Sequence, residues 1–119
     1  MPNYVDGYLL PVPKKNLAAY RAMAAKAGRI WREHGALQYR ECVGEDLNVK
    51  WGMPFPRRFK LKAGETLIFS WIVFKSRAHR DQVNRKVLKD PRIENMGPKD
   101  APFDCTKMGY GGFTVIVDL

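Results

Sequence analysis

In this 119-residue chain, Asp6 is the residue whose type and position most clearly suggest a chemical role. It lies in the apolar stretch from Tyr4 to Val12, where a carboxylate must find a hydrogen-bond donor or a cation, or else carry a shifted pKa. A carboxyl group in such a place either anchors the structure or handles protons in a reaction, and the sequence leaves both roles open. Asp6 is therefore the candidate catalytic residue.

Three other side chains are candidate ligand-binding residues. Trp71 lies in an apolar strand, where it either forms a wall of a substrate site or packs in the core or an interface. Tyr110 lies among glycines and either donates a hydrogen bond into a pocket or simply packs. His79 falls in the first turn of a predicted helix, where the positive end of the helix dipole lowers the basicity of an imidazole.

Other kinds of chemistry find little support. Ser70 has neither a nucleophile elbow nor a suitably spaced His and Asp, so a hydrolase triad is not predicted. Cys42 and Cys105 have neither metal-ligand spacing nor a close partner, which argues against a zinc site and a disulfide framework. Because the sequence contains no metal, flavin or nucleotide motif, we expect neither a metal nor a cofactor.

Two strands that are apolar on both faces hold these candidate residues, one over residues 4–12 and one over residues 65–74. Successive side chains of a strand point to opposite faces, so water must be excluded from both sides of each strand. The chain's own helices can cover one side, and a second copy of the same sheet can cover the other. In the second strand, one face carries Leu67, Phe69, Trp71 and Val73, and the other carries Ile68, Ile72 and Phe74.

The remaining elements follow from periodicity and end signals. Apolar residues recur at steps of three and four after Pro13, which predicts a helix that ends at His34 and Gly35. Ser76 is expected to cap a second helix that runs to about Lys89. Further predictions are a polar edge strand at 37–43, a long loop at 44–64 with a short strand near 59–62, a connection at 92–104 with at most one helical turn, and a last strand at 107–117 whose glycines mark a bulge or a close approach.

The order strand, helix, strand, strand, helix, strand is the split βαβ arrangement of ferredoxin-like folds. We therefore predict an α+β fold in which residues 1–119 form one domain, with a four-stranded antiparallel sheet and the helices on one face. The first and third strands, which are the most apolar, take the centre of the sheet. When the open faces of two such sheets meet, they form a dimeric α+β barrel, so we expect a homodimer through the sheet faces.

The formal charge of +9 invites a nucleic-acid function. The basic clusters at 57–62, 75–80 and 85–89 are each broken by apolar residues, and no RNA-recognition submotif is present. We expect a solvated basic surface without specific nucleic-acid binding, which also suits an anionic small-molecule ligand. The longest apolar run is shorter than the ~18 residues that span a bilayer, and the start lacks a signal-peptide pattern, so we expect a cytoplasmic protein that does not enter membranes.

Several short motifs resemble, in the same order, those of the YbaA-like family of uncharacterised bacterial proteins (domain of unknown function 1428). The resemblance covers nearly the whole chain and implies the dimeric α+β barrel and a bacterial cytoplasmic setting, but no reaction. The motifs are Tyr4-Val5-Asp6-Gly7-Tyr8, Met23-Ala24-Ala25-Lys26-Ala27, Phe69-Ser70-Trp71, Arg80-Asp81 with Asn84, Asp90-Pro91-Arg92, Pro102-Phe103-Asp104 and Met108-Gly109-Tyr110-Gly111-Gly112-Phe113.

The wider barrel superfamily includes small monooxygenases, haem-degrading enzymes and isomerases, in which the ligand lies between sheet and helices. Enzymes of the haem-degrading branch carry Asn, Trp and His on three elements. This chain resembles them in part, because it has Asp6, Trp71 and His79 on broadly comparable elements. A carboxylate in place of a neutral amide that donates hydrogen bonds argues against haem degradation.

Taken together, these features predict a homodimer that holds a small, anionic or aromatic molecule between sheet and helices. One alternative is a cofactor-independent monooxygenase or isomerase in which Asp6 handles the proton. The other is a structural or interaction module in which Asp6 and Trp71 serve packing and dimer specificity.

Overall fold

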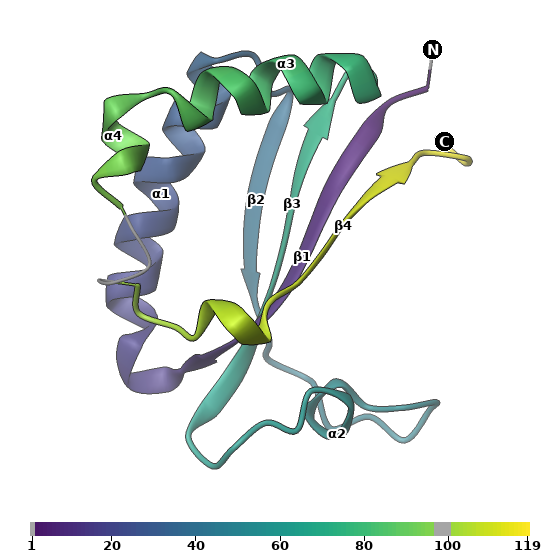
Figure 1. Ribbon diagram of the computed structural model, residues 1–119. Helices are drawn as coiled ribbons and strands as arrows, with labels where there is room; N and C mark the ends of the chain where they lie inside the picture. Colours follow the sequence, from purple (N-terminus) through teal and green to yellow (C-terminus); the bar gives the residue numbers. More distant parts are fainter. Residues whose placement is uncertain (1, 97–100) are drawn as a thin grey trace.

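The computed structural model describes residues 2–96 and 101–119, and its centre is one antiparallel sheet (Figure 1). The strand order is β2-β3-β1-β4, so the two apolar strands predicted for the centre are central, and the predicted ferredoxin-like α+β fold is confirmed. The strands are β1 (Tyr4–Pro13), β2 (Gln38–Val43), β3 (Glu65–Phe74) and β4 (Gly109–Thr114).

Two long helices pack on one face of this sheet, α1 (Leu17–Glu33) and α3 (Arg77–Leu88). A 3₁₀ turn at Lys14–Asn16 leads into α1, and Gly35 ends it with a φ of 117°, a backbone conformation that a glycine adopts at little cost. Ser76 caps α3 as predicted, because its Oγ accepts a hydrogen bond of 3.1 Å from the backbone N–H of His79. A single turn, α4 (Pro91–Glu94), follows.

Strand pairing decides which side chains face the helices. Asp6 pairs with Ile72 and Tyr8 pairs with Ser70, so the even-numbered residues of β1 and β3 share one face. That face is buried under the helices in two apolar clusters. The first comprises Ile30, Ala36, Ile72, Phe74, Val83 and Val87, and the second comprises Leu10, Val12, Tyr20, Ala24 and Ile68.

A row of polar side chains crosses the sheet between the two clusters. Glu41 pairs with Ser70, Ser70 with Tyr8, and Tyr8 with Tyr110, one residue from each strand and all on the helix-facing side. Tyr8 packs against both apolar clusters. The layer between sheet and helices is therefore polar through its middle.

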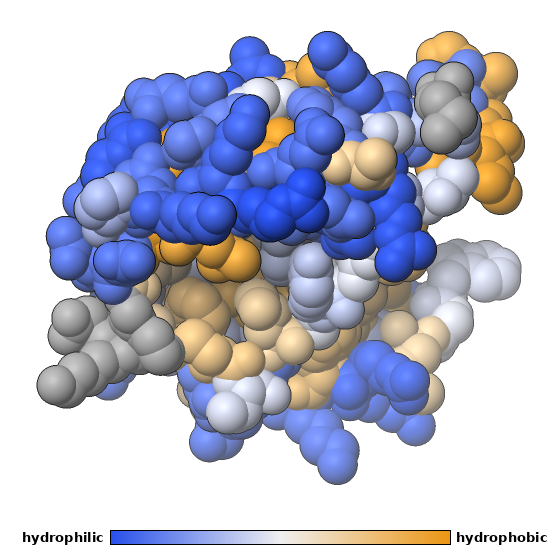
Figure 2. Space-filling model, turned by 45° about the horizontal axis from the view of Figure 1, so that its top comes forward, coloured by the Kyte–Doolittle hydropathy of each residue, from blue (hydrophilic) through white to orange (hydrophobic). Residues whose placement is uncertain are grey.

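Neither α1 nor α3 covers the opposite face of the sheet (Figure 1), and the short helical turn at Phe55–Arg58 contacts β3 near the end where Leu67 is buried. The side chains on this face are largely apolar, and Phe69 is 49% exposed there. By contrast, the outer surface of α3 is mostly hydrophilic (Figure 2). The open face, as we call it below, comprises Val5, Leu9, Leu67, Phe69, Trp71, Val73 and Phe113.

Two predictions about the connections need correction. The short strand near residues 59–62 is wrong, because the chain instead forms a helical turn, α2 (Phe55–Arg58). Pro54 and Pro56 favour the start of a helix, and Lys60 has a φ of 50°, which breaks an extended run. The last strand is shorter than predicted, since a 3₁₀ turn at Cys105–Lys107 precedes it.

The glycines of β4 do not form a bulge, because its pairing with β1 is unbroken. Instead, the missing side chain at Gly112 allows Tyr4 to lie close to the backbone of β4. A side chain on Gly112 would collide with the hydroxyl of Tyr4. The predicted connection at 92–104 contains the one turn of α4, and its residues 97–100 lie outside the described part of the chain.

Candidate functional site

A groove with a volume of about 1070 Å³ lies between α1 and β2. Its walls are mostly apolar, because α1 turns a stripe of small residues toward the sheet at this point. Charged and polar groups lie among them. The groove is lined by Leu17, Ala18, Tyr20, Arg21, Ala24, Ala25, Gly28, Arg29, Arg32 and Glu33 of α1, and by Tyr39, Glu41, Cys42, Val43 and Ile68 of the sheet.

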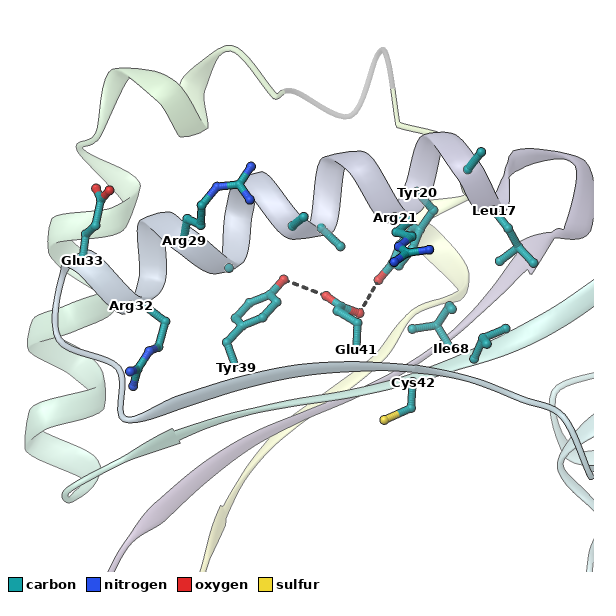
Figure 3. Close-up of a pocket in the computed structure, with 15 residues that line it drawn as sticks. Leu17, Tyr20, Arg21, Arg29, Arg32, Glu33, Tyr39, Glu41, Cys42 and Ile68 are labelled. Atoms are coloured by element: carbon teal, nitrogen blue, oxygen red, sulfur yellow. Dashed lines mark hydrogen bonds between the residues drawn. The ribbon is translucent and has the colours of Figure 1, made fainter.

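A carboxylate held by two phenols lies inside this groove (Figure 3). Glu41 rises from β2 toward the helix, and its Oε1 accepts a hydrogen bond of 2.8 Å from the Tyr20 hydroxyl. Its Oε2 accepts a second bond of 2.6 Å from the hydroxyl of Tyr39. Each bond occupies one of about two acceptor positions on its oxygen, so the carboxylate can still accept from a ligand.

Both phenols are neutral hydrogen-bond donors in this setting. Burial raises the pKa of Tyr20 and of Tyr39, and the neighbouring Glu41 raises both further. The two tyrosines therefore stay protonated at physiological pH and hold Glu41 in one orientation.

Gly28 makes room for this arrangement. A Cβ at Gly28 would lie 2.6 Å from Cδ1 and 2.8 Å from Cε1 of the Tyr39 ring, closer than carbon atoms approach. The absence of a side chain on α1 thus allows Tyr39 to stand against the helix and reach Glu41.

Replacing Gly28 with Ala should therefore lower stability although alanine is the better helix former. We expect overpacking to cost about 1–3 kcal/mol, against a gain of about 1 kcal/mol in helix propensity. Urea unfolding measures the difference. The loss should vanish in a Tyr39→Leu background, and a loss of equal size there would show that Tyr39 is not its cause.

Cations outnumber anions among the residues that line the groove. Arg21, Arg29 and Arg32 stand against Glu33 and Glu41. The Nη1 of Arg32 donates to the carbonyl oxygen of Ala36 at 3.0 Å and also to that of Leu37, which fixes this side chain at the start of β2. Arg21 and Arg29 are exposed on the helix, where their guanidinium groups are available to an anion.

Asp6 lies apart from the groove, in a network between β1 and α3. Its side chain is 0% exposed, and Oδ1 accepts a bond of 2.7 Å from Nη1 of Arg80. Oδ2 accepts from the Asn84 amide at 3.4 Å, and the Oδ1 of Asn84 accepts in turn from the indole N–H of Trp31 at 3.0 Å. Burial raises the pKa of Asp6, while Arg80 and Asn84 oppose the rise.

Arg80 joins Asp6 to a second candidate, Tyr110. Its Nη1 donates to the Tyr110 hydroxyl at 3.4 Å, its Nε donates to Asp81 at 2.8 Å, and its guanidinium lies 4.9 Å from the ring centroid of Tyr4. Tyr110 also stacks on Tyr8, with ring centroids 4.9 Å apart. The structure thus brings Asp6 and Tyr110 together around one guanidinium.

The other two candidates lie elsewhere. Trp71 is on the open face, because it pairs with Gly7 and Arg40 on the side away from the helices. The Nδ1 of His79 accepts a bond of 2.9 Å from the Lys75 backbone N–H, and burial together with nearby lysines lowers the pKa of His79. Neither side chain lines the groove.

The sequence did not predict that Tyr20, Tyr39 and Glu41 belong to the candidate site. A signal for them was present, since Tyr39 and Glu41 alternate along one face of β2 and Tyr20 lies on the apolar stripe of α1. Cys42 and Cys105 are free thiols, the first half-buried and the second exposed. Within residues 2–96 and 101–119, no three His, Cys, Asp or Glu side chains form a group suited to a metal ion, and no helix is long and apolar enough to cross a membrane.

Comparison with known proteins agrees with this fold. A family described as protein of unknown function (DUF1428) matches residues 3–105. The uncharacterised protein YbaA of Escherichia coli strain K12 is 41% identical over 115 residues, covering 97% of each chain, and YbaA of Shigella flexneri matches equally well. Among solved structures, a dimeric ferredoxin-like protein from an uncultured marine organism superposes with a TM-score of 0.56 at 9% identity, over 100% of both chains.

Proposed function

The chain belongs to the DUF1428 family, and on that premise we propose that it is a cytoplasmic homodimer that binds a small molecule in the groove between α1 and β2. The observation that carries the proposal is the groove itself. It is large enough for a ligand of drug-like size, and the carboxylate of Glu41 lies inside it between two phenols.

The chemistry of the groove favours an organic anion with an apolar or aromatic body. Such a body would pack against Leu17, Ala24 and Ile68, and its charge would meet Arg21 and Arg29. The net charge of +9 raises the local concentration of anions around the protein. A hydrogen-bond donor on the ligand would be recognised by Glu41.

The dimer is supported by the open face and by the solved neighbour, a dimeric ferredoxin-like protein. Scattered apolar residues are normal on a surface, but the open face gathers Phe69, Trp71, Val73 and Phe113 on adjoining strands. A second copy buries the same patch on both subunits.

The position of Asp6 supports its role as a structural anchor over a role in proton transfer. It is fully buried, it is paired to Arg80 and Asn84, and it does not line the groove. The isomerase alternative fits this groove with Glu41, not Asp6, as the proton acceptor.

Native mass spectrometry of freshly purified protein tests both parts of the proposal together. We expect a dimer that carries additional mass from a retained ligand. Ala25→Trp places a large ring in the groove, whereas Ala22 is exposed on the same helix and does not line the groove. Ala25→Trp should lose the added mass, and Ala22→Trp should keep it.

Thermal-shift measurements with a panel of aromatic carboxylates and organic phosphates complete the test. At least one member should raise the melting temperature of the wild-type protein and of Ala22→Trp but not that of Ala25→Trp. A bare protein that no member of the panel stabilises would contradict the ligand-binding proposal.

A further inference from the structure

Two apolar segments project from opposite ends of the sheet. The first, here the arm, comprises residues 48–59 between β2 and β3 and contains α2 (Figure 1). Trp51 in the arm is 89% exposed, and Val49, Met53 and Phe55 are exposed as well. The second, here the tail, comprises residues 115–119 after β4. Ile116 is 90% exposed, and Val117 and Leu119 are exposed as well.

Strand pairing places these segments far apart within one subunit. The arm connects Val43 with Glu65, at the end of the sheet where Glu65 pairs with Pro13. The tail follows Thr114, which pairs with Tyr4 at the other end. Ten residues of β1 separate the two ends, or about 30 Å at the usual rise of a strand. The arm and the tail of one chain do not meet.

Both segments lie beside the open face. In Figure 1 the arm extends below the sheet and away from α1, and its helical turn α2 contacts β3. The tail runs away from α1 at the upper end of the sheet (Figure 1). Figure 2 shows a hydrophobic patch at the corner where the tail lies. A second copy seated on the open face would therefore reach both segments.

The charges of the arm and the tail favour one of two orientations of the second copy. If the two-fold axis runs along the strands, the arm of one copy lies beside the arm of the other, and the tails lie together. That arrangement brings together two sets of Lys50, Arg57 and Arg58. If the axis runs across the strands, each arm meets the partner's tail, which carries Asp118. Opposite charges favour the second arrangement, and like charges disfavour the first.

We infer that the arm of each subunit packs on the tail of the other subunit, so that a second copy of this chain is the partner of both segments. The inference rests on the homodimer of the proposed function. The contact joins Trp51, Met53 and Phe55 to Ile116, Val117 and Leu119, with the arm's cations beside Asp118. It occurs twice in the dimer, once at each end of the paired sheets.

Sedimentation equilibrium of the full chain measures the energetic side of this contact. Trp51→Ala and Ile116→Ala should each raise the dimer dissociation constant about tenfold or more, as expected for exposed apolar anchors that become buried. The double variant should lose less than the product of the two effects, because both changes remove one contact. Leu88→Ala, an exposed apolar residue on α3, is the matched control and should leave the constant unchanged.

Cysteine cross-linking identifies which segments meet. In a background with Cys42→Ala and Cys105→Ser, a Trp51→Cys chain is mixed with an Ile116→Cys chain, re-equilibrated and oxidised. A disulfide-linked dimer that contains one chain of each kind is expected, and little cross-linking is expected within either chain population alone.

The outcomes separate the inference from the dimer on which it rests. Cross-linking of Trp51→Cys chains with one another but not with Ile116→Cys chains would overturn it in favour of the arm-to-arm arrangement. A wild-type dimer whose dissociation constant is insensitive to Trp51 and Ile116 would overturn it while leaving the homodimer intact. A wild-type monomer at micromolar concentration would remove the homodimer and the inference together.

Discussion

Replacing Phe69 with Lys should convert the dimer into a folded monomer. The side chain of Phe69 is 49% exposed in the single subunit, so a lysine there can reach water and leave the fold intact. In the proposed dimer the same position would meet the partner's sheet, where the buried ammonium group would lose its hydration without gaining a counter-charge. We expect the dimer dissociation constant to rise by about 100-fold or more.

Sedimentation velocity at micromolar concentration measures this change directly. The melting temperature should also fall and become independent of protein concentration, because association no longer stabilises the folded state. Leu88→Lys introduces the same charge at an exposed apolar residue of α3, and its mass should match that of the wild type. A Phe69→Lys dimer as tight as the wild type would place the interface elsewhere.

Replacing Asp6 with Asn should lower the free energy of unfolding by about 1–3 kcal/mol. The reason lies in the direction of its hydrogen bonds. Arg80 can only donate, and Asn84 must donate to residue 6 because its own oxygen accepts from Trp31. An amide at residue 6 would turn its NH₂ group toward one of these donors, whichever way it is oriented.

Urea unfolding of Asp6→Asn measures that loss, with Asp81→Asn as its matched control. Asp81 accepts from the same guanidinium at 2.8 Å, but its side chain is 46% exposed. Loss of this surface ion pair should cost less than about 1 kcal/mol. An Asp6→Asn protein with unchanged stability would refute the anchor role and favour proton transfer at Asp6.

The sequence predicted most of the fold because several local signals agreed. The two-sided apolar strands required central positions, Ser76 and Gly35 marked helix ends, and the polar pattern of residues 37–43 indicated an edge. The short strand near residues 59–62 was wrong because turn chemistry at Pro54 and Pro56 overrode a weak apolar alternation.

The candidate site was harder to predict, for two physical reasons. Alternation along a strand shows which residues share a face but not which face meets the helices, so Trp71 could be placed only after the structure put it on the open face. Glu41 was overlooked because a charge on an edge strand is usually solvated. Its two partners, Tyr20 and Tyr39, lie on different elements, and only the packing of α1 against β2 brings them together.

The polar row across the sheet also bears on how α1 separates locally from the sheet. A core in one piece resists local opening as a unit, whereas here the buried apolar residues form two clusters, with Glu41 and Ser70 between them and Tyr8 packed against both. The first half of α1 is held by the cluster around Tyr20 and Ala24, and the second half by the cluster around Ile30. The two ends of one helix can therefore fray and close as separate units. The proposed ligand between α1 and β2 would then need to displace only the cluster around Tyr20 and Ala24, because these two residues line the groove.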